Sequence, residues 1–269
     1  MPTEKRQRQK EGRQFRLAAK RKAEKRRQLI RRTVIVVIVA GVVVGSVLLF
    51  TQHSNPPKAA PTPQDKANTA AQVAGCPKAP ATQAVPANKL HWTKPPAEVI
   101  VPGASYVATV STTQGTFAFK LNTAGAPINS NNFVFLAKHN FYNCNIFWRV
   151  IPAFMNQTGD PTSVGTGGPG YVIKQDEYPK RVTTGIQYPK GAVAMANSGP
   201  GTNGSQFYIV AKSATAAELP PKYTIIGQVV SGMPVIEKIN AQGDPNPSSD
   251  NGAHPAVINR ILAVGIQHV

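Results

Sequence analysis

Residues 147–160 bring together the side chains of this chain that are best suited to chemistry. They read F-W-R-V-I-P-A-F-M-N-Q-T-G-D, with a guanidinium at Arg149, a side-chain amide at Gln157 and large apolar groups at Phe154 and Met155. This combination has no nucleophile and no general base. A fixed cation and an amide beside an apolar wall suit a substrate that is apolar, neutral and carries one carbonyl to be held.

The two halves of this stretch must lie side by side for its groups to act together. Alternate residues of a strand share a face, so an extended Arg149 points opposite to Trp148 and Val150. Residues 151–153 (I-P-A) break the strand, because proline cannot donate to a β ladder and restricts the residue before it. We therefore expect the segment from Phe154 to Gln157 to fold back beside the first half.

A second stretch, residues 191–209, reads G-A-V-A-M-A-N-S-G-P-G-T-N-G-S-Q-F-Y-I. Together the two stretches resemble the cyclophilins, a family of peptidyl-prolyl cis-trans isomerases. The family's patterns are close to F-H-R-V-I-P-x-F-M-x-Q-G-G-D-P and M-A-N-x-G-P-x-T-N-G-S-Q-F-F-I. The resemblance runs from about Tyr106 to the C-terminus, roughly three-fifths of the chain.

The resemblance implies a role for each matching residue. Arg149 matches the arginine that stabilises the twisted imide of an X-Pro bond, and Gln157 matches the glutamine that holds the carbonyl of the rotating half. No cofactor is expected. The substrate-binding residues that the resemblance implies are Phe154, Met155, Phe207 and Leu219 around the proline ring, Tyr223 beside them, Ala196 and Asn197 along the substrate backbone, and Gln206 in the polar wall.

Four positions depart from the family's pattern. Trp148 and Tyr223 stand where the family has histidines, and each keeps a flat ring at the site. Tyr208 replaces a phenylalanine, which is a mild change. Glu218 stands where many members have a tryptophan that helps to bind cyclosporin, so high affinity for cyclosporin is not expected.

The fold class follows from the pattern of short strands and from the resemblance. We expect a mainly β domain, a closed eight-stranded antiparallel barrel capped by two helices, as in cyclophilins. Residues 106–121 predict a hairpin with its turn at Gln114 and Gly115. A helix should begin at Pro127, with Phe133 and Leu136 on its apolar side. A last helix is expected near residues 234–239, and a last strand at residues 257–266.

The net charge of +18 is concentrated in a basic arm, residues 1–33. Residues 1–32 hold 14 Lys and Arg against 3 Glu, whereas residues 92–269 hold 12 against 8. The arm has one aromatic residue, Phe15, and the folded part has no basic excess to match it. Nucleic acid is therefore not an expected partner.

Residues 34–50 are seventeen residues without a charge. As a helix they extend about 26 Å, slightly less than the ~30 Å hydrocarbon core of a bilayer. Arg31 and Arg32 can reach the headgroups, and Thr51 can extend the span. We expect a single transmembrane helix over residues 34–51, with the basic arm in the cytoplasm and the rest outside. A cleaved signal peptide and a buried core segment are the alternatives.

Residues 52–95 are rich in Pro, Ala, Gln and Thr and show no hydrophobic period. We expect an extended or disordered extracytoplasmic linker that precedes an isomerase domain over residues 96–269. The two cysteines, Cys76 and Cys144, both follow the apolar segment. On an oxidising side of the membrane they are a candidate disulfide, and two free thiols are the alternative.

Two other features of the sequence do not indicate a binding site. Residues 165–170 match G-x-G-x-x-G, but the following Y-V-I-K-Q-D-E-Y-P starts no helix, so a surface loop is expected rather than a dinucleotide site. The five histidines lack ligand spacing, so no metal site is expected.

The sequence thus predicts a monomeric, bacterial, membrane-anchored isomerase acting on proline-containing exported proteins. The alternative is a non-catalytic module of the same fold that binds Pro-containing segments.

Overall fold

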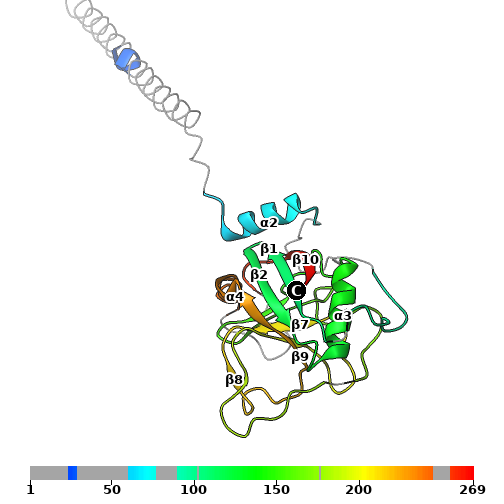
Figure 1. The fold of residues 1–269 in the computed structure, drawn as a ribbon. Coiled ribbons are helices and arrows are strands. Elements are labelled where there is room, and N and C mark those ends of the chain that lie inside the picture. The colour runs from blue at the N-terminus through cyan, green and yellow to red at the C-terminus, as the bar shows by residue number, and fades with distance from the viewer. Residues whose placement is uncertain (1–23, 29–59, 77–89, 102, 176, 245–254) are drawn as a thin grey trace, which may run out of the picture. The chain divides into compact units, whose positions relative to one another are not determined.

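The structure is a computed structural model that describes residues 24–28, 60–76, 90–101, 103–175, 177–244 and 255–269 (Figure 1). The chain divides into two compact units, Met1–Ala60 and Pro61–Val269. In the first unit, residues 24–28 are helical. The expected transmembrane helix, residues 34–51, lies outside the described residues. Among the helices of the described part, none is both long and apolar enough to cross a bilayer.

The second unit is mainly β, as expected, and its largest element is one curled antiparallel sheet (Figure 1). The strand order is β10-β1-β2-β9-β6-β7-β4-β3, and β5 pairs with β8 in a smaller sheet. The outer strands β10 and β3 are brought together by one isolated bridge, Ile146 with Arg260. The strands are β1 (Tyr106–Thr112), β2 (Gly115–Leu121), β3 (Arg149–Ile151), β4 (Met155–Thr158), β5 (Ile186–Tyr188), β6 (Ala192–Met195), β7 (Phe207–Val210), β8 (Ala214–Thr215), β9 (Ile225–Ser231) and β10 (Ile261–His268).

The β1–β2 hairpin forms where the sequence predicts it. Gly115 has φ +128° and lies against the side chain of Val235, so glycine suits both the turn and the close approach. The last strand begins at Ile261, four residues later than expected. The residues before it are irregular because the buried amide of Asn259 accepts hydrogen bonds from Thr113 and Gln114 of the β1–β2 turn.

Two helices pack on the sheet, and in Figure 1 they lie on opposite sides of the β1–β2 hairpin. Helix α3 (Pro127–Lys138) begins at a proline, as predicted, and packs against β10. Helix α4 (Met233–Asn240) packs against β2, β3 and β4 through the buried Ile236 and Ile239. The end of α4 is therefore close to the hairpin that carries Arg149.

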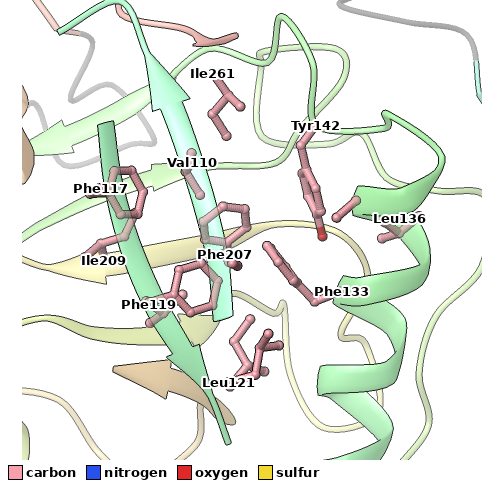
Figure 2. Packing of buried hydrophobic residues seen from close by; sticks show 14 of the residues in the cluster. Val110, Phe117, Phe119, Leu121, Phe133, Leu136, Tyr142, Phe207, Ile209 and Ile261 are labelled. Atoms are coloured by element: carbon pink, nitrogen blue, oxygen red, sulfur yellow. The ribbon is translucent and has the colours of Figure 1, made fainter. Parts of the chain in front are cut away.

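The main core lies between the sheet and α3 (Figure 2). The ring of Phe133 is 5.2 Å from that of Phe119, 4.9 Å from that of Tyr142 and 5.5 Å from that of Phe207. All four side chains are almost fully buried. Burial of each ring contributes about 2–3 kcal/mol, so this cluster holds α3 firmly on the strands.

A further helix, α2 (Pro63–Val73), corrects the expectation that residues 52–95 lack regular structure. Thr62 and Asp65 form a capping box at its start. Its apolar side consists only of Ala67 and Ala71, one turn apart and both buried, a signal too weak to recognise in an alanine-rich segment. The Ile258 amide donates to Gln64 Oε1 at 2.7 Å, which ties α2 to the segment before β10.

Cys76, just after α2, forms a disulfide with Cys144, which precedes β3. Their Cα atoms are 5.4 Å apart, within the range that a disulfide allows. The Cys144 amide donates to Ile261 O at 2.8 Å, and Cys144 O accepts from Arg260 Nη1 at 2.9 Å. The bond therefore links α2 to the place where the two outer strands of the sheet meet.

Reduction of this disulfide should lower the melting temperature of the chain by several degrees. The bond closes a loop with a sequence separation of 68 residues, and the chain-entropy model assigns such a loop about 4 kcal/mol. Thermal melts of the full chain with and without reductant measure the effect. The Cys76→Ser, Cys144→Ser double variant should melt like the reduced chain and respond no further to reductant. Two free thiols in the native chain by alkylation and mass spectrometry would contradict the bond.

Candidate active site

The β3–β4 hairpin brings Arg149 and Gln157 together as the sequence predicts. The two residues are cross-strand partners, and Arg149 Nη1 donates to Gln157 Oε1 at 3.4 Å. Val150 is fully buried on the other face, as expected. Trp148 differs from the expectation, because it precedes the strand and lines the same groove as Arg149.

A hydrogen-bonded chain of side chains continues from Gln157 into a neighbouring loop. Gln157 Nε2 donates to Gln206 Oε1 at 3.0 Å. Gln206 Nε2 donates to the carbonyl oxygens of Gly165 and Gly167, each at 3.0 Å. Gln206 is thus in the polar wall, as predicted, and connects the Arg149–Gln157 pair to the glycine-rich loop.

The loop containing residues 165–170 forms a wall of the groove, and three of its four glycines allow close packing. A Cβ on Gly165 would lie 2.7 Å from the Trp148 ring, one on Gly167 would lie 2.0 Å from Asp160 Oδ1, and one on Gly170 would lie 2.4 Å from His91 Nε2. The buried Asp160 carboxylate accepts from the backbone amides of Thr162, Val164 and Gly165. The motif therefore shapes a protein loop, as predicted, and this loop is part of the site.

An apolar cluster lines the other side of the groove. Met155, Leu219 and Tyr208 belong to one buried cluster, with Phe154 and Tyr223 packed against it. The groove is also lined by Ala196 and Asn197, as the sequence predicts. Its lining residues are Trp148, Arg149, Phe154, Met155, Gln157, Gly165 to Val172, Ala196 to Ser198, Thr202, Gly204 to Gln206, Tyr208, Glu218 to Pro220 and Tyr223.

Phe207 is the one predicted binding residue that the structure places elsewhere. It is fully buried in the main core against Phe133 and Tyr142 (Figure 2). Successive residues of a strand face opposite sides, so its neighbour Tyr208 lines the groove instead. The prediction was wrong by one residue, and the alternation along β7 was the signal that could have corrected it.

The backbone of Asn197 is suited to pairing with an extended peptide. Its side-chain amide donates to Asn203 Oδ1 at 3.1 Å and to Lys222 O at 2.9 Å, which fixes the residue in place. In the part of the chain that the structure describes, no hydrogen bond uses the backbone amide or carbonyl of Asn197. The amide of Ala196, in contrast, donates to Gln206 O at 2.9 Å.

Arg149 gives the groove a positive charge that no carboxylate of the described residues pairs with. None of the ion pairs among the described residues involves it, and its side chain is half-buried. Burial lowers the pKa of Arg149, but an arginine starts so far above neutral pH that it keeps its charge. A cation in a partly dry site, next to an apolar pocket and a free backbone edge, can stabilise a developing lone pair on a bound peptide.

Residues 107–263 match the family model described as "Cyclophilin type peptidyl-prolyl cis-trans isomerase/CLD". The chain belongs to the cyclophilin-type peptidyl-prolyl cis-trans isomerase family. The match covers more than half of the chain, and it includes strands β2 to β9, helices α3 and α4, and every residue that lines the groove. As a member of this family, the chain is an enzyme of the peptidyl-prolyl cis-trans isomerase class.

Individual relatives agree with this assignment. "Probable peptidyl-prolyl cis-trans isomerase B" of Mycobacterium leprae is 38% identical over 172 residues, covering 59% of this chain and 57% of that protein. "Peptidyl-prolyl cis-trans isomerase-like 1" of Aspergillus fumigatus is 43% identical over 129 residues, 48% of this chain and 78% of that protein. The crystal structure of a cyclophilin-type isomerase of Cryptosporidium parvum superposes with a TM-score of 0.50 at 28% identity, covering 61% of this chain and 98% of that one.

Tyr208 gives this cyclophilin-type groove a buried hydroxyl that has no hydrogen-bond partner among the described residues. The Tyr188 hydroxyl nearby is fully used: it donates to Pro220 O or Tyr223 O, at 3.2 and 3.1 Å, and accepts from the Tyr223 amide at 3.1 Å. Burial raises the pKa of Tyr188 to about 12 and raises that of Tyr208 as well, so both hydroxyls stay protonated.

Tyr208→Phe and Tyr188→Phe should therefore change stability in opposite directions. Tyr208→Phe removes a buried hydroxyl that lacks a partner and should raise the free energy of unfolding by about 1 kcal/mol. Tyr188→Phe leaves buried backbone groups unpaired and should lower it by about 1–3 kcal/mol. Denaturant unfolding of the two matched variants measures both changes. If Tyr208→Phe destabilises the chain as much as Tyr188→Phe, the Tyr208 hydroxyl has a partner.

Proposed function

We propose that this chain accelerates the rotation of X-Pro bonds by holding the Arg149 guanidinium beside the imide nitrogen. The rotation barrier is ~18–20 kcal/mol and comes from amide resonance. When the bond twists, the nitrogen becomes pyramidal and regains a lone pair. A nearby cation favours that state over the planar one, and it does so most in a dry site. The supporting observation is a half-buried Arg149 with no carboxylate partner in the described part, beside an apolar cluster.

The other site residues would hold the substrate on either side of that bond. The proline ring would pack against Phe154, Met155 and Leu219, with Tyr223 and Tyr208 completing the pocket. The free backbone groups of Asn197 would pair with the extended peptide. Gln157 donates one amide hydrogen to Gln206, and its second hydrogen is available for the carbonyl of the rotating half. Binding would thus fix one half of the substrate and leave the other free to turn.

Arg149→Ala should lower kcat/KM by at least about 100-fold, the usual loss for one transition-state donor. Arg149→Lys keeps the charge but not the planar guanidinium group. Its kcat/KM should lie between those of the unaltered chain and of Arg149→Ala. A protease-free assay of Pro isomerisation, such as NMR exchange or a solvent jump, measures the rates.

Arg181→Ala removes an exposed arginine that does not line the groove, so it is the matched control and should keep its rate. Full activity in a folded Arg149→Ala variant would overturn the electrostatic mechanism. Binding of Pro-containing peptides without acceleration by the unaltered chain would favour a binding module.

We also infer that the curled sheet acts as a closed eight-stranded barrel capped by α3 and α4. Support comes from the seam between β3 and β10. The Phe147 amide donates to Asn259 O at 3.0 Å, and the Ile261 amide donates to Asn145 O at 2.9 Å, on either side of the Ile146–Arg260 bridge. Closure at this seam would keep β3, and with it Arg149, in a fixed position.

We propose that this isomerase is anchored in a bacterial membrane by residues 34–51, with the domain outside the cytoplasm. The support is the uncharged run itself and the fourteen basic residues that precede it, since basic flanks stay on the cytoplasmic side. Its substrates would then be exported or cell-envelope proteins that contain proline.

Protease added to intact cells should release the domain by cutting between residues 52 and 60, while the basic arm stays protected. A cut within residues 77–89 should release it only after reduction, because the Cys76–Cys144 disulfide spans that cut. Immunoblots with antibodies to the arm and to the domain show which part is lost. Digestion of the arm instead would reverse the orientation. A mature chain that begins near Pro61 would identify a cleaved signal peptide in place of the anchor.

A further inference from the structure

One charged group lines the groove without a place in the mechanism above. Two of the groove-lining residues are charged, Arg149 and Glu218. Glu218 precedes Leu219 of the apolar pocket, and its carboxylate is exposed to solvent. A substrate whose proline packs against Leu219 therefore brings its neighbouring residues close to a negative charge.

The Glu218 carboxylate is held in place by one of its two oxygens. Oε2 accepts from the Thr215 amide at 2.7 Å and from Thr215 Oγ1 at 2.9 Å. The Leu219 amide donates to Thr215 O at 2.9 Å, which closes the same turn. Because Thr215 belongs to β8, which pairs with β5, the carboxylate is fixed to the framework of the pocket.

The other oxygen of this carboxylate, Oε1, has no partner in the part of the chain that the structure describes. The hydrogen bonds from Thr215, together with the charge of Lys212, lower the pKa of Glu218, so the group is ionised at neutral pH. Lys212 is near enough to influence the carboxylate but forms no ion pair with it in the described part.

We propose that Glu218 forms a subsite for a basic side chain next to the substrate proline, so that the enzyme prefers Lys or Arg at that position. This inference rests on the isomerase function proposed above. The Glu218 carboxylate would pair with the ammonium or guanidinium group through Oε1, while Arg149, the other charged residue that lines the groove, would repel a basic residue placed beside it. The two charges would thereby select both the composition and the direction of the bound segment.

The preference can be measured with one host peptide in a protease-free isomerisation assay on the full chain. Lys, Gln or Glu is placed, one position at a time, at the residue before the proline and at the residue after it. At one of these positions the Lys peptide should have about two- to five-fold higher kcat/KM than the Glu peptide at low salt, the size expected for one exposed ion pair. Salt at about 0.5 M should remove most of this difference, because the charges are then screened.

Substitutions then assign the preference to the carboxylate. Glu218→Gln keeps an oxygen for the Thr215 donors and should abolish the ratio between Lys and Glu peptides, whereas Glu218→Lys should invert it. Lys212→Gln should increase the ratio, since a competing cation is lost. Glu237→Gln removes an exposed carboxylate that pairs with Lys190 outside the groove, and it should leave the ratio unchanged.

The outcomes separate this inference from the proposed function. Equal kcat/KM for all peptides, or ratios that Glu218→Gln and Glu218→Lys leave as they were, would overturn the subsite while the isomerase remains. Failure to isomerise even the neutral Gln peptides would overturn the proposed function itself. A preference that persists in high salt would mean that the length of the side chain, rather than its charge, is recognised.

Discussion

The hydrogen bonds of the buried Asn240 amide hold the hairpin on which the groove depends. Asn240 Oδ1 accepts from the Ala153 amide at 2.8 Å, and its Nδ2 donates to Ile151 O and to Asn156 Oδ1, each at 2.8 Å. Ala153 has φ +54°, a strained value for a residue with a Cβ, and a strained turn persists only where its surroundings enforce it. The last residue of α4 thus keeps β3 and β4 paired, and this pairing sets Arg149 opposite Gln157.

The glycine-rich loop sets the orientation of the side-chain amides on the polar side of the groove. Carbonyl oxygens can only accept, so Gly165 O and Gly167 O require the NH₂ group of Gln206 to face them. Gln206 Oε1 must then face Gln157, whose own oxygen is left to face Arg149. The loop carbonyls therefore fix the orientation of both side-chain amides, Gln206 directly and Gln157 through Gln206. As a result the Arg149 guanidinium faces a neutral acceptor, which leaves its net charge unchanged.

The sequence predicts best what depends on neighbouring residues. The β1–β2 hairpin, the start of α3 at Pro127 and the return of the chain after Pro152 all follow from turn residues and local pattern, and the structure confirms them. Phe207 and Tyr208 show where motif matching fails, because a match carries over a residue's identity but not the face of the strand on which it lies. Asn240 could not be found this way, since its partners are more than eighty residues away in the chain.

The N-terminal edge of the domain shows the same dependence on distant contacts. Its expected start at residue 96 followed a change in composition, yet the Trp92 amide donates to Pro169 O at 2.8 Å, and the Trp92 ring lies 5.2 Å from that of Phe135. His91 lies against Gly170, at the end of the loop that anchors Gln206. These contacts place residues 91 and 92 against the loop that forms a wall of the groove, so a domain cut at residue 96 would lose part of the support for the loop that orients Gln206 and Gln157.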